Sequence, residues 1–260
     1  MYRPAAKAAP DSPSGAAFLP ERRAEPHRPV APAPELVAPQ LIAADLVAED
    51  LACRRGARLV FAGVSFRLGA GGALVLTGAN GSGKSSLLRL VAGLLAPAAG
   101  WLIWGGAQVG RDLAGHHARL HYVGHQDAVK PVMTPRETLV FWAALGGPQL
   151  PGAASAVENA LAAFALDAVA DWPCRWLSAG QRRRLALARL LVRPAPLWLL
   201  DEPASALDAD SQARLEEVIT AHRAAGGRVL LATHAAIALD NAAGLTLDTF
   251  APAVDTDLID

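Results

Sequence analysis

Short apolar runs, bounded by glycine, proline or charged residues, alternate along this chain with longer amphipathic stretches. The runs Leu41–Val47 and Leu59–Leu68 predict two strands of an antiparallel layer. Four further runs predict strands, and the last two have the short apolar form of central parallel strands: Ala73–Thr77, Leu120–Gly124, Leu197–Leu200 and Arg228–Ala232. The pattern therefore predicts both an antiparallel and a parallel layer.

Helical periodicity fills the intervals between these strands. A helix is predicted from about Lys84 to Leu95, ended by Pro97. Pro97 and Gly100 interrupt the apolar run from 90 to 104, so it predicts a helix end plus a hairpin, since a membrane-spanning helix needs about 20 apolar residues. Thr134 and Glu137 form a capping-box pattern with a proline at the first helical position, which opens another helix.

The order of these elements predicts an α/β core with a helical subdomain at about 127–180. This subdomain is Ala-rich and is punctuated by glycines and prolines at 146–152. Residues 1–40 are rich in Pro and Ala and cannot bury enough apolar surface to offset their ordering entropy, so we expect a disordered extension. A start codon placed too far upstream would give the same appearance. We expect the folded domain to cover 41–247 and a short acidic tail to cover 248–260.

Composition adds few constraints to this picture. The formal net charge of +0 gives no indication of a nucleic-acid partner. Cys53 and Cys174 are far apart in the chain, which favours a reducing compartment without a disulfide framework. The N-terminus carries Arg3 and Lys7 but no apolar segment of the secretory type, so no signal peptide is expected.

Residues 78–85 read Gly-Ala-Asn-Gly-Ser-Gly-Lys-Ser, between a predicted strand and a predicted helix. This is the phosphate-binding GxxxxGK[ST] pattern, in which glycines let backbone N–H groups approach phosphate and the helix N-terminus favours the anion. Lys84 is suited to the β- and γ-phosphates and the Ser85 hydroxyl to Mg²⁺. The predicted nucleotide-binding residues of this loop are Gly78, Ala79, Asn80, Gly81, Ser82, Gly83, Lys84, Ser85 and Ser86.

Polar residues at the ends of three predicted strands complete the chemistry. Asp201 and Glu202 follow the apolar run at 197–200, where α/β folds bind ligands; Asp201 is suited to Mg²⁺ and Glu202 to activating water as a general base. Gln126 can touch both Mg²⁺ and the helical insert, and His234 can contact the γ-phosphate and Glu202. The predicted catalytic residues are Glu202, His234 and Gln126, and the predicted metal ligands are Ser85, Gln126 and Asp201.

Residues 177–181 read Leu-Ser-Ala-Gly-Gln, which is a signature peptide. With it, the motifs stand in the order found in ABC-transporter ATP-binding subunits. The chain resembles these subunits over about 41–247. The resemblance implies a P-loop NTPase cassette, with a RecA-like mixed sheet core, an antiparallel β subdomain and a helical subdomain. It also implies that two copies dimerise head to tail, with each ATP between one P-loop and the partner's signature peptide. Ser178, Gly180 and Gln181 would then bind ATP across that interface.

Three features depart from the family pattern. Ala179 replaces a common glycine, Ala204 replaces a common threonine, and no aromatic residue for stacking on adenine is obvious near Cys53 to Gly56. Adenine is therefore expected either to stack on an arginine plane or to be held loosely. No phosphate, metal or water-activating group is lost, so ATP hydrolysis is expected. The arginines of the helix predicted at 181–191 are interpreted as a solvated or dimer-facing basic face: Arg182, Arg183, Arg184 and Arg189.

Within the family, the chain is most similar to the ATP-binding subunits of cytochrome c maturation (Ccm) heme exporters. The marks are the segments 51–58, 122–126, 134–139 and 177–184. This resemblance implies a peripheral protein on the cytoplasmic face of a bacterial inner membrane, bound to permease subunits of the Ccm B and C type. ATP hydrolysis would support heme delivery for cytochrome c assembly, with heme handled by the complex rather than by this chain.

Four histidines cluster before the helical insert. On a strand, His121 and His125 would face the same side and could form a ligand pair for heme or a metal. However, His125 adjoins Gln126, and His116 and His117 are predicted in a loop beside Gly115, so solvated or local structural roles are the favoured interpretation.

Three other functions compete with the heme-export interpretation. The chain could energise another small transporter, a choice that the identity of its membrane subunits decides. A soluble, non-transport ABC ATPase is a different class, usually marked by coiled coils, tandem cassettes or basic surfaces. A binding-only regulatory cassette would need a damaged catalytic set, whereas Lys84, Asp201, Glu202 and His234 are all present.

Overall fold

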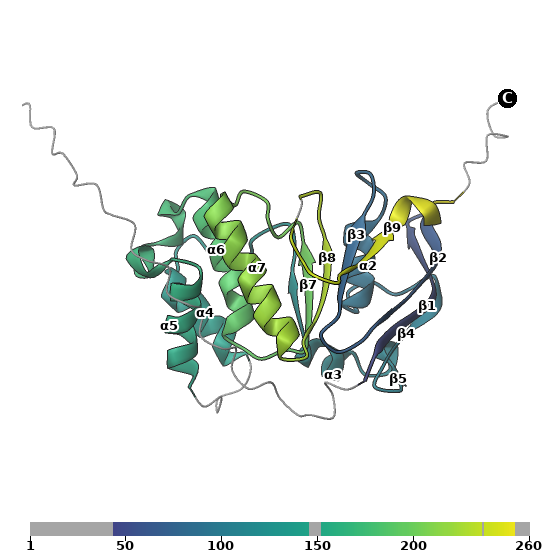
Figure 1. The fold of residues 1–260 in the computed structure, drawn as a ribbon, viewed down its shortest axis with the longest axis horizontal. Helices are drawn as coiled ribbons and strands as arrows, with labels where there is room; N and C mark the ends of the chain where they lie inside the picture. Colours follow the sequence, from purple (N-terminus) through teal and green to yellow (C-terminus); the bar gives the residue numbers. More distant parts are fainter. Residues whose placement is uncertain (1–43, 146–151, 236, 253–260) are drawn as a thin grey trace, which may run out of the picture.

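The computed structural model describes residues 44–145, 152–235 and 237–252. The predicted extension at 1–40, the glycine and proline cluster at 146–151, and the acidic tail from 253 onward lie outside these described residues. The described chain forms an antiparallel sheet with strand order β2-β1-β4-β5 and a parallel sheet with order β6-β7-β8-β3-β9. Helices α4 to α7 lie on one side of the parallel sheet, and the antiparallel sheet lies on the other (Figure 1).

The antiparallel sheet follows the predicted layer, with a shifted first strand. Its strands are β1 (Leu46–Arg55), β2 (Arg58–Leu68), β4 (Ala99–Trp104) and β5 (Ala107–Gln108). β1 continues well beyond Val47, where the predicted strand ended, because it pairs with β2 on one side and β4 on the other. The hairpin predicted after the α2 region is confirmed as β4–β5.

The parallel sheet confirms the buried strands. It comprises β3 (Ala73–Thr77), β6 (Leu120–Val123), β7 (Leu197–Asp201), β8 (Arg228–Ala232) and β9 (Ala243–Thr246). Every residue of β7 and β8 is buried, as expected for strands covered on both faces. β9 was not predicted from the sequence because it is a short edge strand, mostly exposed, and so carries no apolar run.

The predicted helical segments are confirmed, but not all of their ends, and α3 lies where a loop was predicted. They are α2 (Lys84–Val91), α3 (Leu113–Ala118), α4 (Pro135–Ala144), α5 (Ala153–Ala163), α6 (Ala179–Ala188) and α7 (Ala209–Ala224), with 3₁₀ turns η1 (Val109–Arg111), η2 (Asp167–Val169), η3 (Cys174–Trp176), η4 (Arg189–Leu191) and η5 (Leu247–Phe250). The predicted end of α2 at Leu95 is wrong. Gly93 takes the left-handed conformation (φ 72°) and ends the helix before Pro97.

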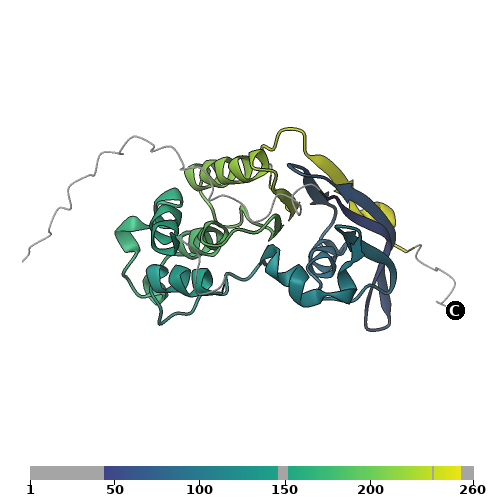
Figure 2. The same cartoon turned by 90° about the horizontal axis from the view of Figure 1, so that it is seen from below.

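Two hydrophobic cores share the parallel sheet as their common wall. Trp198 and Leu200 of β7 face a core built with α4, α5, α6 and α7, whereas Leu197 and Leu199 face a core built with α2 and the antiparallel sheet. This alternation follows from the two-residue period of a strand. In Figure 2, the helices α4 to α7 lie on one side of the molecule, and α2 with the antiparallel sheet lies on the other. The sheet edge between the cores is therefore where polar groups can collect.

Side-chain hydrogen bonds fix the start of the helical subdomain. The Thr134 hydroxyl accepts from the Glu137 N–H at 3.1 Å, and the Glu137 carboxylate accepts from the Thr134 N–H at 2.8 Å. This reciprocal pair confirms the predicted capping box at the first turn of α4. Such a cap contributes about 1 kcal/mol.

The histidine cluster has structural partners. His116 and His117 lie in α3, not in the predicted loop, because Asp112 caps a short helix by accepting from the Gly115 N–H. His116 is fully buried with Nε2 2.8 Å from the Val91 carbonyl, and buried His121 has Nε2 2.8 Å from the Arg193 carbonyl. Across the described ranges, no group of three or more His, Cys, Asp or Glu residues is placed to hold a metal ion.

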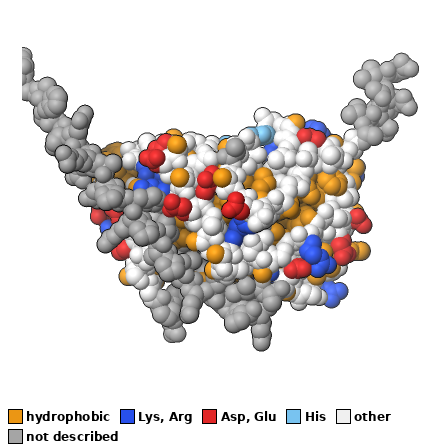
Figure 3. Space-filling model, in the orientation of Figure 1, with side chains coloured by type: hydrophobic (Ala, Val, Ile, Leu, Met, Phe, Trp, Pro, Cys, Tyr) orange, Lys and Arg blue, Asp and Glu red, His pale blue; other side chains and the backbone are white. Residues whose placement is uncertain are grey.

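The face of the molecule seen in Figure 3 has no single dominant charge. Acidic and basic side chains are interspersed over the face shown in Figure 3, in keeping with the net charge of +0. None of the helices in the described part of the chain is long and apolar enough to cross a membrane.

Alanine substitutions at two glycines of the β4–β5 hairpin distinguish the cost of backbone strain from the cost of steric overlap. Gly100 (φ 79°) and Gly105 (φ 64°) are both left-handed, but a Cβ at Gly100 would lie 2.3 Å from the Glu49 carbonyl oxygen, whereas one at Gly105 has open space. Gly105→Ala should lose about 1 kcal/mol of unfolding free energy from backbone strain. Gly100→Ala should lose a further 1 to 3 kcal/mol, roughly, because β1 must move. Urea denaturation of both variants measures the difference, and equal losses would contradict the steric account.

Stability should fall at acid pH because three histidines are buried and burial lowers the pKa of each: His116, His121 and His222. Burial lowers the pKa of His222, which stacks on Trp198, to about 3, and burial followed by the charge of Arg193 lowers the pKa of His121 to about 3. Between the unfolded pKa of about 6.5 and the folded value, the unfolded chain binds more protons. The free energy of unfolding should therefore decrease as pH falls below about 6.5, by about 1.4 kcal/mol per pH unit for each histidine.

Denaturant melts at pH 7.0, 6.0 and 5.0 test this dependence. His222→Phe keeps a ring on Trp198 without a titrating group, so its pH slope should be smaller than that of the parent protein by the share of one histidine, about 1.4 kcal/mol per pH unit, while His116 and His121 keep their contributions. A parent protein equally stable at pH 7 and pH 5 would contradict the prediction.

Candidate nucleotide-binding and catalytic site

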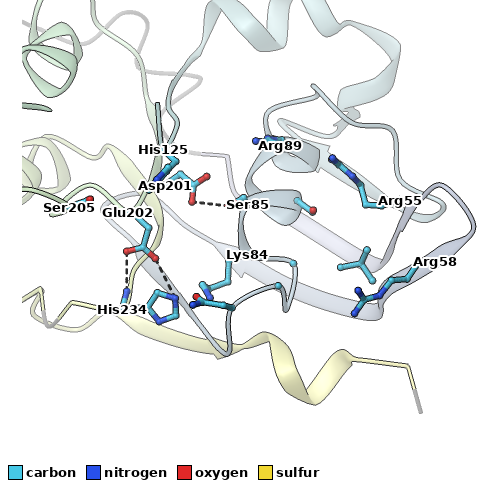
Figure 4. Close-up of a pocket in the computed structure, with 15 residues that line it drawn as sticks. Arg55, Arg58, Lys84, Ser85, Arg89, His125, Asp201, Glu202, Ser205 and His234 are labelled. Carbon is cyan, nitrogen blue, oxygen red and sulfur yellow. Dashed lines mark hydrogen bonds and ion pairs between the residues drawn. The ribbon is translucent and has the colours of Figure 1, made fainter. Parts of the chain in front are cut away.

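A cleft of about 630 Å³ opens at the carboxyl ends of β3, β7 and β8. Its walls come from four parts of the chain: the β1–β2 hairpin, the loop before α2 with the first turns of that helix, the ends of β6 and β7, and the end of β8 (Figure 4). The lining residues are Arg55, Arg58, Val60, Asn80, Gly81, Gly83, Lys84, Ser85, Ser86, Arg89, His125, Asp201, Glu202, Ser205 and His234.

The glycines of the loop allow close packing as well as unusual backbone angles. Gly83 has φ 108° and immediately precedes α2. A Cβ there would lie 2.8 Å from Val60 Cγ1 and 2.9 Å from Phe61 Cδ1, so β2 packs directly against the loop. The first N–H groups of α2 have no side-chain cap at Gly83, which suits an anion at this helix end.

Lys84 places its ammonium group at the loop. Its side chain is mostly buried, and Nζ donates to the carbonyls of Gly78 at 2.7 Å and Ala79 at 3.0 Å. A compact cation held against these carbonyls at the edge of the cleft is suited to phosphate oxygens.

Asp248 contacts the same loop and was not predicted. Its carboxylate accepts from the Ala79 N–H at 3.0 and 3.2 Å, and a Cβ at Gly78 would lie 2.9 Å from Oδ2. The folded part of the chain therefore extends past 247, where the predicted domain ended, through η5 to Phe250. A single aspartate in an expected tail gave no sequence signal.

Three of the predicted loop residues do not line the cleft. Ala79 is exposed and directs its N–H to Asp248, and the Ser82 hydroxyl is buried with no hydrogen-bond partner among the described residues. Gly78 is likewise outside the lining, whereas Asn80, Gly81, Gly83, Lys84, Ser85 and Ser86 all lie in it.

A hydroxyl and a carboxylate meet at the centre of the cleft. Ser85 Oγ donates to Asp201 Oδ1 at 3.0 Å, and Asp201 is almost fully buried at the end of β7. Two oxygen donors brought together beside a phosphate-binding loop are the chemistry that Mg²⁺ prefers. The pair of residues fits a bound Mg²⁺ ion.

Glu202 takes a strained backbone conformation directly after Asp201. Its φ is 50°, and its N–H donates to the Ala232 carbonyl at 2.8 Å. The N–H of His234 donates to Glu202 Oε2 at 3.2 Å, and His234 Nε2 lies 3.7 Å from Oε1 (Figure 4). The predicted contact between Glu202 and His234 is therefore present.

The predicted Gln126 lies outside this cluster. It is exposed and does not line the cleft, whereas its neighbour His125 does. Asp127, one residue further on, is paired with Arg183 at 3.1 Å. In the segment after β6, His125 therefore lines the cleft, and Asp127 contacts Arg183 of α6.

The signature residues lie outside the cleft of their own chain. Ser178 Oγ accepts from the Gln181 N–H at 3.1 Å, and Gln181 Oε1 accepts from the Ser178 N–H at 2.8 Å, a capping box at the start of α6. A Cβ at Gly180 would lie 3.0 Å from the Ala206 carbonyl oxygen, so α6 packs against the loop after β7. Ser178, Gly180 and Gln181 do not line the cleft.

The prediction of a solvated or dimer-facing arginine face is wrong for two of its four members. Arg183 is only 3% exposed and Arg189 6%, whereas Arg182 and Arg184 are half-buried. Arg183 shares its helix face with Leu187 and Leu190, the i+4 and i+7 positions, a spacing that could have indicated its burial. Arg189 donates to the Tyr122 carbonyl and lies 4.7 Å from the Trp142 ring.

The end of the cleft opposite Glu202 is lined by cations. Arg55 and Arg58 pair across the β1–β2 hairpin, and both line the cleft with Val60 and Arg89 (Figure 4). Among the described residues that line the cleft, the only rings belong to His125 and His234. A base at this end would meet guanidinium groups and a valine.

The sequence and the fold match known proteins. The family model described as ABC transporter matches residues 61–205. A relative from Paramagnetospirillum magneticum, named cytochrome c biogenesis ATP-binding export protein CcmA, is 57% identical over 202 residues, covering 78% of this chain and 93% of the relative. A protein of the same name from Rhodospirillum rubrum is 58% identical over 200 residues, covering 77% and 84%.

Among solved structures, an ATP-binding subunit of an ABC transporter superposes with a TM-score of 0.68 at 24% identity, covering 73% of this chain and 79% of that one. This likeness supports the fold alone. The family model spans more than half of the chain, and the relatives match it over most of their own length. The chain therefore belongs to the ABC transporter family of ATP-binding proteins.

Proposed function

We propose that this protein is the ATP-hydrolysing subunit of an ABC transporter complex that energises heme export or delivery for cytochrome c maturation. The observation that carries the ATPase is one cleft in which Lys84, the Ser85–Asp201 pair and the Glu202–His234 pair converge. The heme role is supported by relatives that carry the cytochrome c biogenesis name at 57% identity or above.

ATP binding uses groups that the loop already presents. Lys84 exchanges its carbonyl acceptors at Gly78 and Ala79 for oxygens of the β- and γ-phosphates. The N–H groups at the start of α2 face the same anion. The opposite end of the cleft, with Arg55, Arg58 and Val60, takes the base.

Ser85 and Asp201 would hold Mg²⁺, which when bound offsets the phosphate charge. Their oxygens are 3.0 Å apart, and Asp201 is almost fully shielded from solvent. Glu202 follows Asp201 in the chain, so the residue that would hold the metal and the proposed general base are neighbours at the end of β7.

Glu202 is the general base. As the oxygen of a water molecule attacks the γ-phosphorus, the bond from that phosphorus to the ADP oxygen breaks and the water proton passes to the Glu202 carboxylate. The N–H of His234 orients this carboxylate through Oε2. Exposed Gln126 joins the site from outside the cleft and helps to position the γ-phosphate and the water.

The signature residues act on the nucleotide of a second copy. Ser178 and Gly180 lie outside their own cleft at the N-terminus of α6, so they reach a nucleotide in a head-to-tail dimer. Gln181 supports them through the capping box. Hydrolysis then opens the dimer.

The helical subdomain transmits this opening to permease subunits of the Ccm B and C type. Apolar side chains on and around α4 are well exposed, which supports a protein partner on this surface: Val132, Val140, Phe141 and Leu145. The protein is then peripheral on the cytoplasmic face of the inner membrane, heme is handled by the complex, and no nucleic acid is involved.

Glu202→Gln should abolish turnover and leave ATP binding intact, because the amide cannot accept the proton but keeps the size of the side chain. We expect steady-state ATP hydrolysis to fall by at least about 100-fold and an ATP-bound dimer to accumulate. Glu49→Gln, on an exposed β1 residue, is the matched control and should hydrolyse ATP normally. Normal hydrolysis by Glu202→Gln would remove Glu202 from this role.

The proposed role in heme export predicts which membrane proteins bind this chain. Affinity purification of the full chain from membranes of its source bacterium, followed by mass spectrometry, should recover permease subunits of the Ccm type. An unrelated permease would retain the ATPase chemistry and replace heme with another cargo. Recovery of no membrane subunit would favour a non-transport ATPase.

A further inference from the structure

The guanidinium of Arg183 connects the carboxylate-bearing strand end to the segment after β6. Nε donates to the Pro203 carbonyl at 3.2 Å, and Nη2 donates to the carbonyls of Asp201 at 2.8 Å and Glu202 at 2.7 Å. Nη1 donates to the Gly124 carbonyl at 2.9 Å and to Asp127 Oδ1 at 3.1 Å. A guanidinium has five N–H donors, and each of them has an acceptor here.

The contact of Nη2 bears on the backbone strain at Glu202. The carbonyls of Asp201 and Glu202 flank the φ and ψ rotations of Glu202, whose φ is 50°. In a left-handed residue, successive carbonyls turn toward the same side, which lets one nitrogen bind both of them. Such a conformation is strained and persists only where the surroundings hold it. Arg183 supplies that hold on the carbonyl side.

The contacts of Nη1 reach the segment that leads into the helical subdomain. Gly124 and Asp127 bracket His125 and Gln126, the residues next to the cleft on this side. Asp127 is also the ion-pair partner of the buried Arg183 guanidinium. Such a partner is needed because a buried charge is stable only when it is paired and fully hydrogen-bonded. One rigid plane therefore fixes residues 201–203 relative to residues 124–127.

We infer that Arg183 is a positioning residue for ATP hydrolysis, which holds Glu202 in its catalytic conformation and makes that conformation depend on the position of the 124–127 segment. The inference rests on the proposed role of Glu202 as general base. A shift of the helical subdomain that moved residues 124–127 would pull on the same guanidinium that holds the Glu202 backbone. Arg183 does not itself line the nucleotide cleft, and it acts through Asp201 and Glu202, which do.

Lysine cannot replace this group. Its ammonium has three donors from one nitrogen, so it cannot span acceptors in both segments at once. Arg183→Lys keeps the charge and breaks the connection. Arg184→Lys is the matched control, because Arg184 lies on the same helix and donates to the Phe164 and Ala165 carbonyls, away from the cleft. Asp127→Asn weakens the connection from the other side without altering α6.

The test measures steady-state ATP hydrolysis and ATP-binding stoichiometry of the full chain in its membrane complex. Arg183→Lys should lower kcat by about 100-fold, the loss expected when a catalytic group is misplaced by about 1 Å. The KM for ATP should stay within about threefold of the parent value, and the number of ATP sites should be unchanged, because the phosphate contacts are intact. Asp127→Asn should lower kcat by about tenfold at most, and Arg184→Lys should match the parent protein.

Three results would overturn the inference. The first is a normal kcat in Arg183→Lys, and the second is a fall in its ATP hydrolysis that is matched by a fall in the number of ATP sites. The third is an equal fall in kcat in Arg184→Lys. Amide hydrogen exchange gives a readout that needs no turnover. Arg183→Lys should speed exchange at residues 202–205 and 124–127 together, and Arg184→Lys should not. A parent protein that failed to hydrolyse ATP would refute the proposed function, whereas unchanged exchange in Arg183→Lys would refute the connection itself.

Discussion

The central strands of the parallel sheet, β7 and β8, are buried on both faces, and the rest of the molecule depends on this constraint. Every residue of β7 and β8 is buried, and the apolar ones belong to one core or the other, so the polar residues of these strands stand only at their ends. Asp201 stands at the last position of β7, and Glu202 and His234 lie just beyond the ends of their strands. The chemistry is concentrated at this edge because the cores exclude it elsewhere.

Buried arginines donate hydrogen bonds to backbone carbonyls that the β-sheets leave without a partner. Carbonyls at strand ends lose their ladder partners, and in a closed interior they need other donors. Arg183 serves the carbonyls after β7, Arg189 serves Tyr122 in β6, and Arg228 serves Leu68 and Ala44 in the antiparallel layer. Each guanidinium joins segments that no β-ladder joins.

The sequence revealed those parts whose physics is local. Strands β3, β7 and β8 are short continuous apolar runs, and the phosphate-binding loop carries its glycines, lysine and hydroxyl within a few residues. The partners of Arg183 and the role of Asp248 are different, because they depend on carbonyls and N–H groups that every residue possesses and no residue type marks. The end of α2 was misplaced because Gly93 stops the helix before Pro97 does, and the first strand was misplaced because its length depends on two pairing neighbours.

The contact between Asp248 and Ala79 bears on how the protein is made. The two residues are 169 positions apart, and β3, which leads into the phosphate-binding loop, lies between β8 and β9. During synthesis on the ribosome, β3 emerges long before either neighbour, and its long-range pairing must wait for them. The loop can reach its final shape only when nearly the whole domain has left the exit tunnel. A nascent chain would then gain ATP as a ligand at the end of its synthesis rather than during it.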